Sequence, residues 1–220
     1  MSEPDARTPR ERYRAQVREE VKQHAWEQIA TAGASALSLN AIAKQIGMSG
    51  PALYRYFANR DELISELIRD AYRSLADAFH ARAEAGTDLG DLAHALRAWA
   101  LADPQRYLLV YGTPVPGYQA PEDTVRITAE IMSVLLDACA AQQPSAVPPS
   151  PLEARLEAHL DEHRAWAAAH PAGPAVLHRA LTFWTRLHGL LSLELSGHFT
   201  GMGFDPALLY TAEAGTLTTP

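Results

Sequence analysis

The chain has 220 residues, of which 47% are hydrophobic and 20% are charged, a composition typical of a globular protein with a sizeable core. No apolar run is long enough for a membrane span, the charged N-terminus lacks the apolar segment of a signal peptide, and Cys139 alone cannot form an internal disulfide framework. We therefore expect a cytoplasmic protein with no membrane partner.

The net charge of −7 argues against a surface that attracts nucleic acid everywhere, but the charge is unevenly distributed. Residues 1–60 contain nine Lys or Arg and six Asp or Glu, a net charge of +3, whereas residues 61–220 carry −10. The N-terminal part can therefore attract phosphates, and the acidic remainder would help to orient the encounter.

The first residues predict a tail followed by a helix. Residues 1–11 are polar, and we expect them to be disordered; the arginines from Arg7 to Arg14 either start a solvated helix or form a basic arm that reaches phosphates. An apolar stripe with helical spacing then predicts a helix over 12–31 that ends at Gly33, with Trp26 in its core. The stripe consists of Val17, Val21, Ala25, Ile29 and Ala32.

Residues 38–57 contain two short helical patterns with almost nothing between them. Ser38 suits an N-cap, and Gly47, which tolerates positive φ, ends the first pattern. Ser49 can cap the second, and Pro51 falls in its first turn. This arrangement predicts a helix-turn-helix, whose second helix can enter a DNA major groove.

Two apolar residues decide which side chains the second helix displays. Leu53 and Phe57 lie four positions apart and point to one core, so Tyr54, Arg55 and Tyr56 point partly outward. An exposed Tyr-Arg-Tyr sequence after such a turn has little packing rationale, which favours a DNA-reading role over an ordinary helical hairpin.

This region resembles the TetR family of transcriptional repressors over roughly residues 17–68. The matching residues are Ala41-Ile42-Ala43, Gly47-Met48-Ser49, Leu53-Tyr54, Tyr56-Phe57 and Arg60-Asp61-Glu62-Leu63. The resemblance implies a DNA-binding set made up of Ser38, Lys44, Ser49, Gly50, Pro51, Ala52, Tyr54, Arg55, Tyr56 and Arg60. Within it, residues 50–52 and 55 would lie nearest the base edges, and the tyrosines, Lys44, Arg60 and Ser38 would contact phosphates.

One departure from the family pattern bears on DNA specificity. Many members carry Lys, Thr or Ser where this chain has Gly50-Pro51-Ala52, so only Arg55 offers a donor fork for guanine. Pro51 and Ala52 could contact thymine methyl groups. We therefore expect few base contacts, supplemented by the recognition of DNA shape.

The remaining sequence is helical throughout, with no strand-type alternation. Asn59, with Glu62 three residues later, predicts a capped helix that starts at residue 60 and connects the two halves over 59–84. Further helices follow over 89–102, 122–141, 152–169, 174–199 and 204–215, a short helix that starts at Asp103-Pro104 carries Tyr107, Leu108 and Tyr111, and residues 144–151 form a Pro-rich linker. The predicted fold is all-α: a three-helix helix-turn-helix domain at 12–58 and a larger helical domain at 85–215.

The C-terminal half resembles the WHG-type domain of some TetR regulators. The matching residues run from Tyr107 to Tyr118 and include Trp184, Leu187-His188-Gly189-Leu190 and Ser192-Leu193-Glu194-Leu195. This resemblance implies a module that binds a small molecule and dimerises. Candidate ligand residues are Trp99, Tyr107, Tyr111, Tyr118, Phe183, Trp184 and His188, and candidate dimer residues are Leu177, Leu181, Trp184, Leu187, Leu191 and Leu195.

We interpret the chain as a homodimeric, ligand-responsive regulator of transcription, a repressor released from a palindromic double-stranded DNA operator by a small molecule. We expect no catalytic residue, no cofactor and no metal. Two alternatives remain open. The segment His159-Leu160-Asp161-Glu162-His163 matches the zinc pattern H-x-x-E-H of a metal-dependent hydrolase, although its stripe of leucines is also that of an ordinary amphipathic helix. The other alternative is a helical adaptor whose helix-turn-helix no longer binds DNA.

Overall fold

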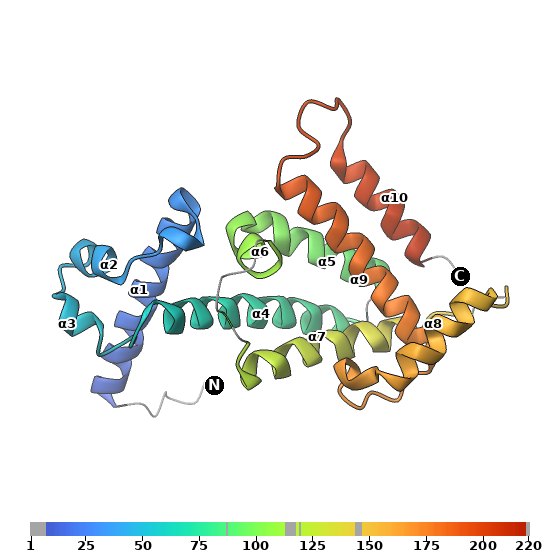
Figure 1. Cartoon of the computed structure of the whole chain (residues 1–220), viewed down its shortest axis with the longest axis horizontal. Helices are drawn as coiled ribbons and strands as arrows, with labels where there is room; N and C mark the ends of the chain where they lie inside the picture. The colour runs from blue at the N-terminus through green and yellow to red at the C-terminus, as the bar shows by residue number, and fades with distance from the viewer. Residues whose placement is uncertain (1–7, 87, 113–117, 119, 144–146, 219–220) are drawn as a thin grey trace.

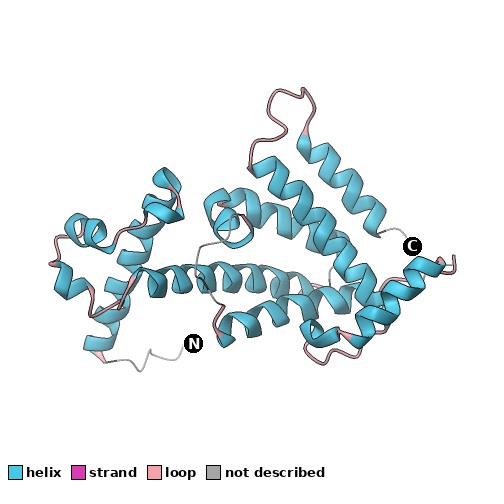
Figure 2. Cartoon of the chain, viewed as in Figure 1, coloured by secondary structure: helices cyan, strands magenta, loops and turns pink. Residues whose placement is uncertain are grey.

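The computed structural model describes residues 8–86, 88–112, 118, 120–143 and 147–218, and this part of the chain contains helices and no strands (Figure 2). The N-terminal head consists of α1 (Pro9–Ala32), the short η1 (Ala34–Ala36), α2 (Leu39–Gln45) and α3 (Gly50–Leu53). The C-terminal bundle consists of α5 to α10. Figure 1 shows α4 (Arg60–Glu84) running lengthwise from the head into the bundle. None of the described helices is long and apolar enough to cross a bilayer.

The helix α1 starts at Pro9, three residues inside the segment expected to be a tail. Thr8 and Glu11 form a capping box, in which the Thr8 hydroxyl accepts from the Glu11 N–H and the Glu11 carboxylate accepts from the Thr8 N–H at 2.7 Å. Pro9 occupies the first turn, where its missing N–H is not needed. Residues 9–11 are therefore helical, which corrects that part of the prediction.

The helix-turn-helix forms where the sequence predicts it. The Ser38 hydroxyl caps α2 by accepting from the Ala41 N–H at 3.3 Å, and Gly47 adopts a φ of +69°, which a residue with a side chain rarely adopts. Ser49 stands at the N-cap of α3, but its hydroxyl makes no capping hydrogen bond. The chain then turns at residues 54–56 and enters α4.

The N-terminus of α4 is capped almost as predicted. The Asn59 side chain accepts from the Glu62 N–H at 2.8 Å. The Glu62 carboxylate accepts from the N–H of Ala58, one residue before the expected position, at 2.6 Å. Two backbone donors at the helix start, the N–H groups of Ala58 and Glu62, are thereby satisfied.

Helices of the C-terminal bundle pack along α4 and around α9. These helices are α5 (Leu89–Ala102), α6 (Pro104–Tyr111), α7 (Glu122–Ala140), α8 (Pro151–Glu162), the short η2 (Arg164–Ala167), α9 (Pro174–Leu195) and α10 (Pro206–Thr218). Helices α5, α6 and α7 contact α4, and α9 lies against α5, α6, α7, α8 and α10. The predicted helix over 152–169 is thus two pieces, and α9 ends four residues before the predicted position.

Much of the apolar stripe on α9 packs inside its own chain. Leu177, Leu187 and Leu191 are fully buried in the core that α9 shares with its neighbours. Half of the six residues predicted as dimer surface are therefore unavailable to a partner, because the bundle surrounds α9 on several sides.

Candidate nucleic-acid interface and ligand cavity

Buried apolar residues at the end of α3 and after the turn that follows it hold the polar side chains of that turn, residues 54–56, toward solvent. Leu53 and Phe57 are fully buried, whereas Tyr54 is 46% exposed and Arg55 is exposed. Tyr56 is half-buried, and its ring lies 5.7 Å from the guanidinium carbon of Arg14. The helix is only four residues long, so its orientation depends on this core.

Of the residues predicted to contact DNA before and within α3, Gly50 lies close to α2. A Cβ atom at Gly50 would meet the side-chain oxygen of Asn40 on α2 at 3.2 Å, closer than most Cβ contacts. A larger residue at position 50 would therefore require the exposed Asn40 side chain to shift by a few tenths of an ångström. Pro51 and Ser49 are exposed, and Ala52 is half-buried.

The two predicted phosphate cations have different surroundings. Lys44 is exposed in the last turn of α2. Arg60, by contrast, donates to the Ala34 carbonyl at 2.6 Å and lies 3.5 Å from the Asp61 carboxylate. Arg60 thus links α4 to the turn after α1, and less of its charge is available to a phosphate.

Arginines of α1 extend the basic surface beside α3. Arg10, Arg14 and Arg55 line a shallow hollow of about 280 Å³ together with Tyr13 and Tyr56. Arg14 also donates to the Arg55 carbonyl at 3.2 Å. The first helix therefore contributes positive charge next to the predicted reading helix. The cluster of arginines between residues 7 and 14 is the feature of the sequence that indicates this positive charge.

Arg18 fastens the reading segment to the rest of the molecule. Its guanidinium donates to the Tyr56 carbonyl, lies 2.9 Å from the Glu66 carboxylate and stacks 4.1 Å from the ring centre of Phe57. This proximity lowers the pKa of Glu66 against the opposing effect of burial. Because Glu66 belongs to α4, Arg18 connects three segments at one point.

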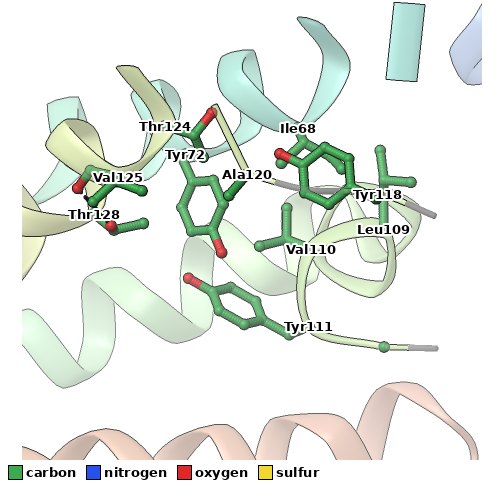
Figure 3. A pocket seen from close by; sticks show the side chains of 11 residues that line it. Ile68, Tyr72, Leu109, Val110, Tyr111, Tyr118, Ala120, Thr124, Val125 and Thr128 are labelled. Carbon is green, nitrogen blue, oxygen red and sulfur yellow. Dashed lines mark hydrogen bonds between the residues drawn. The ribbon is translucent and has the colours of Figure 1, made fainter. Parts of the chain in front are cut away.

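A cavity of about 580 Å³ lies between α4, α6 and α7. Figure 3 shows hydroxyl-bearing side chains around it, with the phenol groups of Tyr72 and Tyr111 directed toward one another. The two rings meet edge to face with their centres 6.0 Å apart. The described wall consists of Ile68, Tyr72, Leu109, Val110, Tyr111, Gly112, Tyr118, Ala120, Thr124, Val125 and Thr128.

A smaller cavity of about 160 Å³ adjoins the first and shares Tyr72, Tyr111 and Thr128 with it. Trp184 lines this second space, together with Ile131 and Met132. Three of the predicted ligand residues, Tyr111, Tyr118 and Trp184, therefore stand on a cavity wall.

The other four predicted ligand residues belong to the core behind that wall. Trp99 is 6% exposed and donates through its ring N–H to the Ser74 hydroxyl at 2.8 Å. Phe183 is fully buried in the same hydrophobic cluster. Tyr107 and His188 stack with ring centres 5.6 Å apart, and His188 lies 4.2 Å from each of the rings of Tyr111 and Trp184.

A buried polar network supports this aromatic wall. The Tyr107 hydroxyl lies 3.1 Å from Nδ1 and from the carbonyl oxygen of His188, and 2.9 Å from the Ser192 hydroxyl. Burial lowers the pKa of His188 to about 3, so its imidazole is neutral at neutral pH. Glu194, on the same helix as His188, is paired with Arg97 of α5, with their charged atoms 2.6 Å apart.

The buried imidazole makes stability depend on pH in a defined direction. The unfolded chain takes up a proton at His188 near its ordinary pKa of about 6.5, whereas the folded chain resists protonation down to about 3. The contribution of the neutral His188 to the free energy of unfolding is therefore fully present above pH 6.5 and is lost as the pH falls toward 3.

We expect the wild type to lose about 1.4 kcal/mol more than His188→Phe when the pH falls from 7.5 to 5.5. Urea unfolding of both proteins at the two pH values measures this difference. A control substitution of the exposed His198 by Ala should keep the wild-type dependence. Equal losses in the wild type and in His188→Phe would show that His188 is protonated in the folded chain.

Tyr72, Thr124 and Thr128 line the cavity although the sequence did not single them out as ligand residues. Tyr72 falls in the apolar stripe of α4, where spacing predicts only burial. Thr124 and Thr128 lie four apart on α7 and so share one face, a signal that becomes informative only once α7 is known to face α4.

The helix α6 connects the cavity to the head. The buried Leu109 belongs to the hydrophobic cluster of α1 to α4, whereas Tyr107 of the same helix belongs to the cluster of the C-terminal bundle. Tyr72 packs against both clusters, and Tyr118 packs against the first. The cavity therefore lies at the junction of the two hydrophobic cores.

The H-x-x-E-H segment lies on the surface, away from this cavity. His159, Glu162 and His163 are all exposed, and their potential ligand atoms lie within 4.8 Å of one another. Nδ1 of His163 lies 3.0 Å from the His159 carbonyl oxygen. The geometry would admit a metal ion, but only a shallow surface hollow adjoins His159 and Glu162.

Comparison with known proteins supplies the family. The model described as bacterial regulatory proteins, tetR family, matches residues 23–67, and that described as tetracyclin repressor-like, C-terminal domain, matches residues 89–217. The HTH-type transcriptional regulator Rv1816 of Mycobacterium tuberculosis is 33% identical, and the alignment covers 93% of this chain and 92% of that protein. The regulator Mb1846 of Mycobacterium bovis matches to the same extent.

Solved structures share the fold. The crystal structure of SCO4313, described as a candidate regulatory protein, is 67% identical with a TM-score of 0.86 and covers 97% of this chain and 100% of its own. The transcriptional regulator FadR of Bacillus subtilis, solved with stearoyl-CoA, is 14% identical with a TM-score of 0.54, over 91% of this chain and 97% of its own. At that identity the likeness concerns the fold alone.

Proposed function

Because the chain belongs to the TetR family of transcriptional regulators and carries its DNA-binding helix-turn-helix, we propose that it is a homodimeric repressor that a small molecule releases from a palindromic operator. The observation that carries the proposal is the cavity at the junction of the two cores, in contact with the helix that supports the head. A ligand held there touches both the sensing and the DNA-reading parts.

In this proposal α3 reads the major groove. Arg55 supplies the donor fork for guanine, and the exposed Pro51 and the half-buried Ala52 contact thymine methyl groups. The phosphate contacts come from Ser38, Lys44, Ser49, Tyr54, Tyr56 and, more weakly, Arg60. The arginines Arg10 and Arg14 join them from α1, since they line the same hollow as Arg55.

Substitution of Arg55 by Ala should cost about 1–3 kcal/mol of discrimination between the operator and a variant with its guanine contact changed. Fluorescence anisotropy with both duplexes at one salt concentration measures this. The exposed Arg155→Ala on α8 is the matched control, because it removes the same charge far from the head. Unchanged discrimination in Arg55→Ala would remove Arg55 from the reading surface.

Two copies are needed because one short reading helix touches few phosphates. Two-fold dimers place such helices about 34–36 Å apart on a palindrome. Exposed apolar side chains at the α9–α10 end support a dimer surface there, since Leu193 is 43%, Leu208 71% and Leu209 39% exposed. Exposed leucines that gather on neighbouring helices are typical of an association surface.

Ligand release requires the effector to bind one dimer shape more tightly than the other. A molecule between α4, α6 and α7 can do this by separating α6 from α4, which would displace Leu109 in the core of the head. The head of each subunit would then tilt, and the spacing of the two reading helices would no longer fit the operator.

Selection of bound duplexes from random DNA, repeated with candidate ligands, tests the proposal. We expect a palindrome with half-sites about one helical turn apart, and weaker retention when the effector is present. Enrichment of single, unpaired half-sites would contradict the homodimer. A palindrome whose binding no small molecule changes would contradict ligand release.

A further inference from the structure

The described part of the cavity wall carries hydroxyl groups but no charged side chain. Among the described residues that line the two cavities, every polar side chain is a tyrosine or a threonine, apart from the indole of Trp184. Tyr72, Tyr111 and Tyr118 extend toward the space from three different segments (Figure 3). An ion in this space would lose its hydration and would find only neutral dipoles in return.

The arginines beside the cavity are already paired. Arg69 of α4 lies 2.6 Å from the Asp123 carboxylate and 3.0 Å from that of Glu66. One turn along, Arg73 lies 2.6 Å from the Glu130 carboxylate of α7. A carboxylate or phosphate ligand would have to displace one of these carboxylates. The existing ion pairs therefore disfavour the binding of an anion.

The polar point most clearly left for a ligand is the Tyr111 hydroxyl. It is buried and has no hydrogen-bond partner among the described residues. The Tyr118 and Thr124 hydroxyls on the same wall also lack one, but the ring of Tyr111 is the one that contacts both Tyr72 and Trp184. Burial raises the pKa of Tyr111 well above its ordinary value and also raises that of Tyr72, so both phenols stay protonated and able to donate. A buried donor without a partner costs free energy, which an acceptor on a ligand would recover.

The rings around that hydroxyl favour a flat apolar body. Tyr111 meets Tyr72 and Trp184 edge to face, with ring centres 6.0 and 6.1 Å apart. Aromatic ligands gain from such contacts beyond the area that they bury. A volume of about 580 Å³ is within the range of cavities that take drug-sized molecules.

We propose that this cavity selects an uncharged, aromatic small molecule with a hydrogen-bond acceptor, to which the Tyr111 hydroxyl donates a hydrogen bond. This inference rests on the proposed function, because it gives the chemical class of the small molecule that would release the repressor from DNA. Aromatic stacking supplies affinity, and the absence of an unpaired cation or anion on the described wall excludes charged analogues of the same shape.

Four probes of nearly one shape test the inference on the full chain: methyl 2-naphthoate, 2-naphthoate, naphthalene and 2-(aminomethyl)naphthalene. Isothermal titration at pH 7.5 compares the ester, the anion, the hydrocarbon and the cation. We expect the ester to bind at least about 10-fold more tightly than either ion, because burial of an uncompensated charge is costly. Naphthalene should bind about 3- to 10-fold more weakly than the ester.

The variant Tyr111→Phe keeps the ring and removes the hydroxyl. It should lower the affinity for the ester about 3- to 10-fold and leave that for naphthalene unchanged. Tyr13→Phe, at a 62% exposed position on α1, is the matched control and should bind both probes as the wild type does. An ion that binds as tightly as the ester, an ester unaffected by Tyr111→Phe, or no binding of any probe would overturn the inference.

Retention of operator DNA, measured with the same probes, separates this inference from the proposed function. If a charged probe binds and releases the DNA, regulation by a small molecule stands and the assignment of an uncharged ligand falls. If the ester binds through Tyr111 but leaves the DNA bound, the uncharged class stands and ligand release is contradicted.

Discussion

Replacement of Phe57 by Ala is expected to lower the free energy of unfolding by about 3–5 kcal/mol and, with it, to abolish operator binding. Phe57 is fully buried between the reading segment and α4, and the Arg18 guanidinium lies 4.1 Å from its ring centre. Truncation leaves a cavity and removes the surface on which Arg18 stacks. Because α3 has only four residues, no helix length of its own can compensate.

Urea unfolding monitored by circular dichroism, together with gel shift on the operator, measures both effects. The variant Tyr54→Phe is the matched control: it changes a neighbouring aromatic residue that is 46% exposed, and its stability should stay within about 0.5 kcal/mol of the wild type. If Phe57→Ala had the same urea midpoint as the wild type, the stability of the head would not depend on this core.

Replacement of Arg97 by Met is expected to destabilise the C-terminal bundle by about 3–5 kcal/mol, because it leaves the Glu194 carboxylate without its partner. The Arg97 and Glu194 side chains are only 18% and 16% exposed, and their charged atoms lie 2.6 Å apart. The guanidinium also lies 5.6 Å from the ring centre of Tyr210, so α5, α9 and α10 meet at this pair.

The double variant Arg97→Met with Glu194→Leu separates the cost of an unpaired charge from the worth of the pair. It should recover most of the lost stability, since two apolar side chains can replace a buried ion pair. The ion pair of the exposed Arg186 and the half-buried Glu213, 2.9 Å apart, gives the comparison: Arg186→Met should cost about 1 kcal/mol or less. A loss in the double variant as large as in Arg97→Met would contradict this account.

Local sequence signals predicted the helix-turn-helix because each of its features is short-range. The spacing of Leu53 and Phe57, the Ser38 cap and the glycine at position 47 each act within one or two turns, and the structure has them as predicted. The start of α1 has a short-range signal of the same kind: Thr8, Pro9 and Glu11 form the capping-box pattern, although the polar composition around them is that of a tail.

The cavity could not be predicted in the same way, because it depends on how distant helices meet. Spacing placed Tyr72 on the inner face of α4, but an inner face can pack against core or line a space, and periodicity does not distinguish the two. For the same reason Trp99 and Phe183 were expected on the wall and lie behind it. Charge likewise predicted a phosphate contact for Arg60 without revealing the Ala34 carbonyl that accepts its hydrogen bond.

The contribution of Leu109 to the core of the head limits how this protein could be recombined with its relatives. A chimera joined at the end of α4 would take the whole helix-turn-helix but leave behind the leucine that completes its interior. In such a chimera the apolar surface of the head that Leu109 covers would be exposed, unless the α6 of the other protein had a side chain that fits it. The unit that must be transferred as a whole is therefore discontinuous in sequence. It consists of the reading head and α6, which follows α5 in the chain.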